Sequence, residues 1–384
     1  MRQLPGGVSP YFDEDAHSFR DAVRGFAASA LRGFADDGEV NERLPRAYFN
    51  TVGAQGLFGL RQPVEFGGTD GSLIIETIAV EEVSRVACGL ASAMMPQLLV
   101  QGLLRDHATE EQKERYLPGM IRGEIVCSIA MTEPDAGSDV RSITTALRKS
   151  GGGLQVSGRK TYITNGPVAD VVVLLARDEE GAEAGYSLVL VEADDAGFDR
   201  GTKLAKLGNR ASEVAELGFD DVAVKPERII GNRGKAFETM RHAIAVSRII
   251  FAARSLGLAQ CAYEVGRDYA NTRETFGRPL IRHQLVADKL AEVHLDLTHA
   301  RLATAQAAWQ YDSGYDVALI ASQAKLVASE AATRITDRVL QIHGGMGYMM
   351  ESPVQQYWRD ARLLTISEGT SEIQRLEIAR HLRS

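Results

Sequence analysis

The sequence contains little cysteine and none of the familiar short nucleotide-binding motifs. Its three cysteines, Cys88, Cys127 and Cys261, are widely separated along 384 residues, so neither a zinc site nor a C-x-x-C redox pair is expected. No G-x-G-x-x-G follows a predicted strand, and no G-x-x-x-x-G-K-[ST] is present. We therefore predict no metal site, and any dinucleotide must bind without a Rossmann unit or a P-loop.

Positive charge is not in excess either. Lys and Arg number 43 against 51 Asp and Glu, giving a net charge of −8, which argues against a nucleic-acid partner. The N-terminal residues show no basic stretch followed by an apolar one, so no signal peptide is expected. No apolar run approaches the roughly 20 residues of a membrane span. We predict a cytoplasmic globular protein without a nucleic-acid or membrane partner.

Hydrophobic periodicity changes twice along the chain. In the first part, apolar residues recur every three or four positions, as at Phe19, Val23 and Phe26, which predicts helices. These helices are expected at 13–33, 71–87 and 90–104, with a further start at Thr109. From about Glu124, short β-branched runs broken by Gly, Asp and Asn predict strands. The strands are expected at 124–132, 154–163, 170–177, 186–192 and 214–224.

Helical periodicity returns after Gly234. Long helices are expected at 235–271, 283–312, 314–343 and 370–383, which suits a four-helix bundle. We therefore predict an α+β fold with three domains. These are an N-terminal α-helical domain (1–123), a middle β domain of barrel-like or sandwich-like form (124–232) and a C-terminal helical bundle (233–384).

One carboxylate stands out near the C-terminus. Ser367-Glu368-Gly369-Thr370-Ser371 places it on a glycine-containing turn at a predicted helix start, beside hydroxyl groups. A carboxylate held there against an apolar cavity can serve as a base. A Glu at a helix start also simply favours the positive end of the helix dipole. The segment by itself leaves both interpretations open.

Four other segments accompany Glu368. They are AMTEPDAGSD from Ala130, GRKTYITNG from Gly158, RETFGRPL from Arg273 and QIHGGMGYMMESP from Gln341. In that order and at those separations, the chain resembles the acyl-CoA dehydrogenase family over nearly its whole length. The resemblance implies an FAD-dependent oxidoreductase of fatty acid metabolism, commonly a homotetramer, with an electron-transferring flavoprotein as acceptor.

The resemblance also implies a reaction. Glu368 removes the α proton of an acyl thioester, the β hydride passes to flavin N5, and a trans-2-enoyl thioester forms. The family places its base either at this Glu or on a helix just before an Arg. Here the second position is Ser247, before Arg248, and a serine cannot act as the base. Burial should raise the pKa of Glu368 towards neutrality.

Residues that contact the flavin ring follow from the same resemblance. They are Ile129, Met131, Thr132, Tyr162, Thr164, Thr370 and Glu372. Tyr162 stands where many relatives have Trp and keeps an aromatic surface. Judged only by their residues, the 130–139 segment is also compatible with a structural loop, and Tyr162 with ordinary sheet packing.

The segment at 272–282 breaks two long helices. Arg273 there suits a helix C-terminus, where a cation is favoured, but its guanidinium fork also matches phosphate oxygens. In the family, matching residues reach the FAD of a neighbouring subunit. This carries over to Arg273, Thr275, Phe276, Gln284, Gln341, Gly344 and Gly345. We therefore expect a homo-oligomer, at least a dimer and in the family commonly a tetramer.

The resemblance implies that the substrate is an acyl-CoA or an acyl carrier protein thioester. The resemblance assigns substrate contacts to Ser138, Ser247, Arg248, Ser367 and Gly369. Two departures from the family leave the substrate open. Ala245 replaces the usual Asp that touches the pantetheine arm, and Ser367 replaces a frequent Tyr. We expect room for a branched or bulky acyl group, with its far end near residues 91–100, which include Met94, Met95 and Leu98.

Three alternatives stay open. An acyl thioester oxidase differs from a dehydrogenase in oxygen access, which the sequence does not reveal. A flavin monooxygenase on the same fold generally lacks the catalytic Glu, so Glu368 argues against it. A non-catalytic relative of the fold is disfavoured by the acidic balance and by Glu368.

Overall fold

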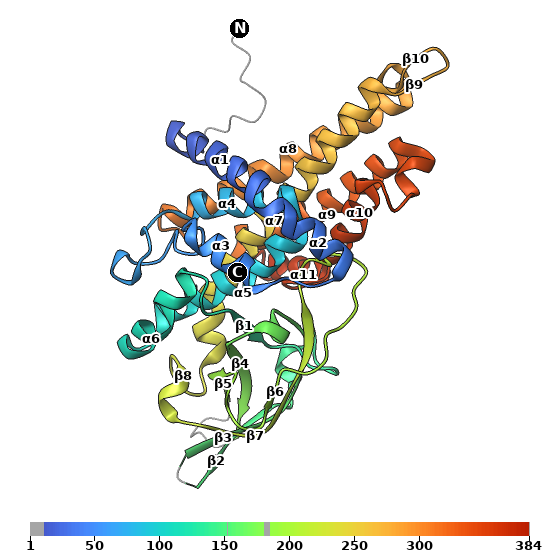
Figure 1. The fold of residues 1–384 in the computed structure, drawn as a ribbon. Coiled ribbons are helices and arrows are strands. Elements are labelled where there is room, and N and C mark those ends of the chain that lie inside the picture. The colour runs from blue at the N-terminus through green and yellow to red at the C-terminus, as the bar shows by residue number, and fades with distance from the viewer. Residues whose placement is uncertain (1–10, 152, 180–184, 384) are drawn as a thin grey trace.

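A computed structural model describes residues 11–151, 153–179 and 185–383. Helices come first, a β domain follows, and long helices return at the end (Figure 1). The β domain lies at one end of the molecule, and the paired ends of two long helices project from the other. The predicted α+β fold is confirmed.

The N-terminal part is helical, as predicted. Its helices are α1 (Glu14–Phe26), α2 (Arg32–Asn41), α3 (Arg46–Ala54), α4 (Leu73–Val86), α5 (Cys88–His107) and α6 (Glu110–Ile121). A π-helical turn, Ala27–Leu31, joins α1 to α2. Thr109 caps α6 through a reciprocal capping box with Gln112, which confirms the helix start expected there. The expected helix at 13–33 ends near the start of α2, so α2 was not predicted, and neither was α3, a short helix that buries Tyr48, Phe49 and Val52.

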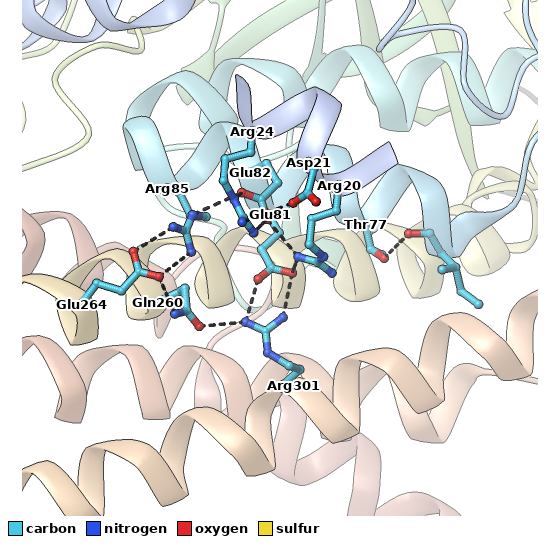
Figure 2. Close-up of polar contacts among 11 residues, drawn as sticks. Arg20, Asp21, Arg24, Thr77, Glu81, Glu82, Arg85, Gln260, Glu264 and Arg301 are labelled. Carbon is cyan, nitrogen blue, oxygen red and sulfur yellow. Dashed lines mark hydrogen bonds and ion pairs between the residues drawn. The ribbon is translucent and has the colours of Figure 1, made fainter. Parts of the chain in front are cut away.

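A charged cluster joins four helices of the helical part (Figure 2). Glu81 on α4 pairs with Arg20 on α1 at 2.8 Å and with Arg301 on α8 (Gln284–Asp312) at 2.8 Å. Arg85 on α4 pairs with Glu264 on α7 (Ala236–Thr272) at 2.8 Å. Burial alone would raise the pKa of Glu81, but Arg301 and Arg20 outweigh it and lower this pKa to about 2.

The β domain is one strongly curved sheet. Its longer strands are β1 (Cys127–Ala130), β2 (Ala146–Ser150), β3 (Gly153–Thr164), β4 (Val171–Asp178), β5 (Gly185–Glu192) and β7 (Val214–Val224). Two short strands, β6 (Phe198–Asp199) and β8 (Ile229–Ile230), lie at the ends of the order β6-β7-β3-β2-β4-β5-β8, and β1 pairs with β4. All five predicted strands are present; β2, β6 and β8 were missed.

Both faces of this sheet are covered. One core cluster contains only residues of the β domain, including Val156, Leu174 and Phe219. A second cluster packs the opposite face of β4 and β5 against α5, α6 and the start of α7. Because both faces are buried, β4 reads as an unbroken apolar run from Val171 to Ala176. This packing brings the sheet against the helices that carry the site.

The C-terminal part contains the four predicted helices and one more. They are α7, α8, α9 (Ala318–His343), α10 (Pro353–Leu364) and α11 (Ser371–His381). Helix α10 was not predicted; its first helical residue is Pro353, a position that favours proline. The short strands β9 (Glu274–Thr275) and β10 (Arg278–Pro279) pair between α7 and α8.

Helix α7 is the centre of the helical packing. By length and composition alone, α7 is long and apolar enough to cross a membrane, which was not expected of any segment of the sequence. However, 78% of its most apolar 18-residue stretch is buried inside the protein. It contacts α4, α5, α8 and α9. A helix that is apolar on most sides is typical of the core of a large helical domain.

Candidate functional site

Glu368 lies on a strained turn between α10 and α11. Its φ is +57°, and the φ of the next residue, Gly369, is +81°. A left-handed Glu is uncommon and is retained only where its surroundings enforce it. A Cβ on Gly369 would lie 2.7 Å from Nε2 of Gln374. The turn therefore needs glycine at 369, and it fixes the direction in which Glu368 leaves the backbone.

The carbonyl oxygens of this turn accept hydrogen bonds from two side chains. Nε2 of Gln374 donates to the carbonyl oxygens of Glu368 at 2.9 Å and Gly369 at 3.1 Å. Nζ of Lys325, on α9, donates to the same Gly369 oxygen at 2.8 Å. In contrast, the backbone N–H of Glu368 has no acceptor among the described residues. That donor is free for a ligand.

The carboxylate of Glu368 is in a charged but desolvated environment. Burial raises its pKa, while Arg248 and Lys325 partly offset this rise. The hydroxyl of Ser247 acts in the same direction as the cations, although Ser247 Oγ has no hydrogen-bond partner of normal geometry among the described residues. Glu368, Ser247 and Arg248, three of the site residues expected from the sequence, therefore lie close together.

Arg248 is fixed by the bundle. Its Nη1 donates to Oγ of Ser322 on α9 at 3.1 Å, and its Nε is buried without a partner among the described residues. Its Nη2 lies 3.8 Å from the position that a Cβ of Gly369 would occupy. The guanidinium is thus next to the Glu368 turn.

A cavity between α5 and α7 reaches this site at Ser247. It is narrow, with room for about one water molecule. Its walls are Leu98, Leu99, Gly102, Ala243, Val246, Ser247 and Ile250, with Arg61, Arg105, Asp106 and His242 around the rest. Of the three residues expected near the acyl end, only Leu98 lines this cavity; Met94 and Met95 are buried in the helical core.

An aromatic ring and two free hydroxyls lie along one edge of the β domain. A bulge in β3 between Lys160 and Ile163 gives Tyr162 a φ of +59° and leaves its side chain 69% exposed. Thr132 adjoins it, because the Thr132 carbonyl accepts a hydrogen bond from the Thr161 N–H at 2.9 Å. The hydroxyls of Thr132 and Thr164 make no hydrogen bond among the described residues. This edge suits a flat polar ring system.

The other predicted ring contacts lie nearby in the chain or at the C-terminal turn. Ile129 and Met131 are half-buried in and after β1. The hydroxyl of Thr370 caps α11 by accepting from Ile373 N at 3.3 Å. Thr370 and Glu372 line a hollow between α9, α10 and the start of α11. Ser138 lies exposed in the loop after β1, and Ser367 is half-buried before Glu368.

A second group of predicted cofactor residues lies far from Glu368. Arg273, Thr275 and Phe276 are at the projecting tip between α7 and α8, at the opposite end of the molecule from the β domain (Figure 1). Gln284 begins α8 and Gln341 lies in the last turn of α9 close to that tip, and Gly344 and Gly345 follow in a 3-10 turn. Phe276 is 97% exposed. One chain therefore does not bring the two groups together.

Two residues that donate hydrogen bonds to the Glu368–Gly369 turn were not predicted from the sequence. Lys325 and Gln374 are both completely buried. Each lies in a region that was predicted to be helical, where a Lys or Gln is ordinarily assigned to the solvent face. No local signal distinguishes them, since their partners are backbone carbonyls 44 residues away for Lys325 and 5 and 6 residues away for Gln374.

Comparison with known proteins shows the family of the chain. Models of the N-terminal, middle and C-terminal domains of acyl-CoA dehydrogenases match residues 13–124, 128–222 and 234–383. The chain is 37% identical over 372 residues to the mitochondrial short-chain specific acyl-CoA dehydrogenase of Bos taurus, covering 96% of this chain and 90% of that protein.

Two further similarities extend the comparison. A 3-(aryl)acrylate reductase of Clostridium sporogenes is 34% identical over 375 residues, which cover 97% of this chain and 99% of that protein. The solved structure of the prolyl acyl carrier protein oxidase AnaB has a TM-score of 0.91 and 31% identity, covering 97% of this chain and 99% of that one.

These matches bear on the predicted enzyme class and cofactor. The family models together span nearly the whole chain, and family members are flavin oxidoreductases that use FAD and act on CH–CH groups. The predictions of an FAD-dependent oxidoreductase and of a role in fatty acid metabolism are confirmed at this level. The chain belongs to the acyl-CoA dehydrogenase family, as its motifs predicted.

Proposed function

We propose that this protein catalyses the FAD-dependent α,β-dehydrogenation of an acyl thioester, with Glu368 as the base. The observation that supports this most strongly is the Glu368 turn itself. A left-handed carboxylate residue with a free backbone N–H adjoins a serine that lines a cavity. One residue thus offers an acceptor for a proton and a donor for an oxygen at the same place.

The two groups of Glu368 suit the two requirements of α-proton removal. The free backbone N–H is available to bind the thioester carbonyl oxygen, which stabilises negative charge that develops there. The carboxylate then takes the α proton. When bound, FAD would supply the acceptor for the β hydride, and the product would be a trans-2-enoyl thioester with the flavin reduced. The raised pKa of Glu368 makes it a stronger base than an exposed carboxylate.

The exposed edge of the β domain suits the flavin ring. Tyr162 offers an aromatic face, and the unpaired hydroxyls of Thr132 and Thr164 offer polar contacts to ring atoms. Ile129 and Met131 would add half-buried apolar surface. We assign Thr370 and Glu372 to contacts with the same flavin end of FAD.

A second copy of the chain would complete the FAD site. Arg273, Thr275 and Phe276 are at a projecting tip remote from Tyr162. A guanidinium suits a pyrophosphate, and the open space around Gly344 and Gly345 allows a close approach by another molecule. We therefore propose a homo-oligomer, a dimer or tetramer, in which the tip of one subunit contacts the FAD of its neighbour.

The domain limits at 123/124 and 232/233 and the cytoplasmic location also remain predictions.

The acyl group could be carried by CoA or by a carrier protein. Ala245, on α7, replaces the Asp that the family directs at the pantetheine arm. AnaB, whose substrate is a prolyl group on an acyl carrier protein, is a neighbour at 31% identity. Both observations favour testing carrier-protein thioesters beside CoA thioesters. Ser138, Ser247, Arg248, Ser367 and Gly369 are the proposed substrate contacts.

The test is anaerobic reduction of the purified flavoprotein by a panel of acyl-CoA and acyl carrier protein thioesters. We expect one of them to bleach the flavin absorbance, and we expect Glu368→Gln to bind the same thioester without bleaching. Bleaching by Glu368→Gln at the wild-type rate would contradict the assignment of the base. Branched acyl thioesters should outperform unbranched butyryl or octanoyl ones if Ser367 provides room.

An acyl thioester oxidase is the second candidate, since AnaB is an oxidase. Reoxidation distinguishes the two. A dehydrogenase that uses an electron-transferring flavoprotein should reoxidise slowly in air and rapidly with that acceptor, whereas an oxidase should reoxidise rapidly in air and yield hydrogen peroxide.

A further inference from the structure

We propose that Lys325 is a positioning residue for Glu368: its buried ammonium group holds the Glu368–Gly369 turn from the bundle side through the Gly369 carbonyl oxygen. This inference rests on the proposed function of Glu368 as the base. It concerns a residue that would touch neither the substrate nor the flavin.

The position of Lys325 is unusual for a lysine. It lies in the first third of α9 with its side chain completely buried, whereas lysine is almost never fully buried unless it is paired. Its one direct hydrogen bond among the described residues goes to the Gly369 carbonyl, at 2.8 Å. Nζ also lies 5.3 Å from the centre of the Phe251 ring on α7, a favourable distance for a cation.

Helix α9 braces the site at two points on one face. Ser322 lies three residues before Lys325, so the two side chains are neighbours on the helix surface. Ser322 accepts from Arg248 at 3.1 Å while Lys325 donates to Gly369 at 2.8 Å. One helix face therefore fixes both the arginine beside Glu368 and the residue that follows Glu368.

The turn needs such bracing because it is strained. Glu368 has a left-handed φ of +57°, which is unfavourable for a side-chain-bearing residue. Gln374 and Lys325 together supply three hydrogen bonds to the two carbonyl oxygens of the turn. Without them the chain could relax towards a right-handed φ, and the carboxylate would turn away from Ser247.

The charge of Lys325 also acts on the base. The charged groups that act on Glu368 are Arg248, Lys325 and Arg254, and all three oppose the rise in its pKa caused by burial. Lys325 in turn experiences Glu368, Arg248, Glu330 and Glu372, and burial lowers its pKa to about 8. Removing the lysine charge should therefore raise the pKa of Glu368 further.

Three variants separate the effect of the hydrogen bonds to the turn from the effect of the Lys325 charge. Lys325→Met removes both the hydrogen bond and the charge, whereas Gln374→Met removes neutral hydrogen bonds to the same turn. Lys325→Arg keeps the charge. Lys225→Met, on the exposed surface after β7, is the control.

The first measurement is the single-turnover rate of flavin bleaching as a function of pH. We expect Lys325→Met to slow bleaching by about 10- to 100-fold, as for loss of a hydrogen bond to a charged group, with little change in thioester affinity. Its acidic limb should move to higher pH. Gln374→Met should slow bleaching without moving that limb, and Lys325→Arg should restore the position of the limb.

The second measurement does not depend on turnover. Carbodiimide coupling of an amine to the Glu368 carboxyl, followed by peptide mass spectrometry, reports its protonation in the holoenzyme. We expect labelling of Lys325→Met to persist to higher pH than labelling of the wild type and of Lys225→Met.

The outcomes distinguish this inference from the proposed function. Wild-type bleaching and labelling by Lys325→Met, with Glu368→Gln inactive, would refute only the role of Lys325. Bleaching by Glu368→Gln would refute the base itself. If Lys325→Met does not fold, Lys325→Arg, which keeps the charge but places its donors differently, and Gln374→Met decide through the bleaching rate alone: a wild-type rate in both would overturn the inference.

Discussion

The ammonium group of Lys160 donates a 2.8 Å hydrogen bond to the carbonyl oxygen of Met131. This contact joins the middle of β3 to the segment that follows β1. Lys160 also forms a 3.0 Å ion pair with Glu133, whose carboxylate accepts from the backbone N–H groups of Thr144 and Thr145. The loop that presents Thr132 is therefore fixed from inside, next to the bulge that presents Tyr162.

We predict that Lys160→Met destabilises the protein and weakens FAD binding. The Lys160–Glu133 pair is buried, so removing one partner leaves an uncompensated charge and should cost about 3–5 kcal/mol. Thermal unfolding of the apoprotein and titration with FAD measure the two effects. Lys225→Met, at an exposed position after β7, should change neither. An unchanged melting temperature and FAD affinity in Lys160→Met would show that the loop is held by other contacts.

Replacing Tyr162 should weaken FAD binding without unfolding the β domain. The ring is 69% exposed, so its loss removes little core packing. An aromatic contact contributes about 0.5–1.5 kcal/mol, so Tyr162→Ala should raise the Kd for FAD by roughly 2- to 10-fold. Tyr162→Trp should bind as well as the wild type. Tyr315→Ala, 61% exposed between α8 and α9, serves as the control. Equal affinities for all four proteins would remove Tyr162 from the flavin site.

Two glycines with similar backbone angles should respond differently to alanine. Gly369 has a φ of +81° and Gly314 a φ of +76°. An added Cβ would lie 2.7 Å from Gln374 at position 369 but would meet nothing within 4 Å at position 314. Both alanines should cost about 1–2 kcal/mol from backbone strain. Only Gly369→Ala should also disturb the base and slow flavin bleaching. Equal bleaching rates in the two variants would argue against a tightly held turn.

The charged cluster around Glu81 should make stability depend on acid. The pKa of Glu81 is lowered to about 2 from 4.5, so the folded carboxylate binds its proton less readily than the unfolded one. This contribution is fully present above pH 4.5 and is lost as the pH falls towards 2; it amounts to roughly 3 kcal/mol. Glu81→Gln should lower the melting temperature at pH 7 and much less at pH 3.

The control for this prediction is Asp21→Asn. Asp21 is 78% exposed in the same cluster, where an ion pair contributes little. A loss of stability in Glu81→Gln that is the same at pH 3 and pH 7 would mean that packing, rather than charge, holds the cluster together.

Local hydrophobic patterns were sufficient to predict an element when burial of its apolar residues determines its structure. The alternation and apolar runs of β4 and β5 and the long apolar repeats of α7, α8 and α9 located these elements closely. The missed elements have weak local signals. β6 and β8 have two residues each, and α3 and α10 are short helices whose stability depends on residues such as Tyr48 and Val354 that are buried by the rest of the protein.

The sequence by itself determined the family, the three-part α+β order and the identity of the candidate base, because motifs and hydrophobic periodicity are written locally. The tertiary structure decided which residues support that base. Lys325 and Gln374 meet the Glu368 turn only because α9 and α11 pack beside it. It also placed Tyr162, in the bulge of β3, apart from Phe276, at the projecting tip between α7 and α8. Such relations arise from long-range packing, in which distant residues become neighbours without any trace in the local pattern.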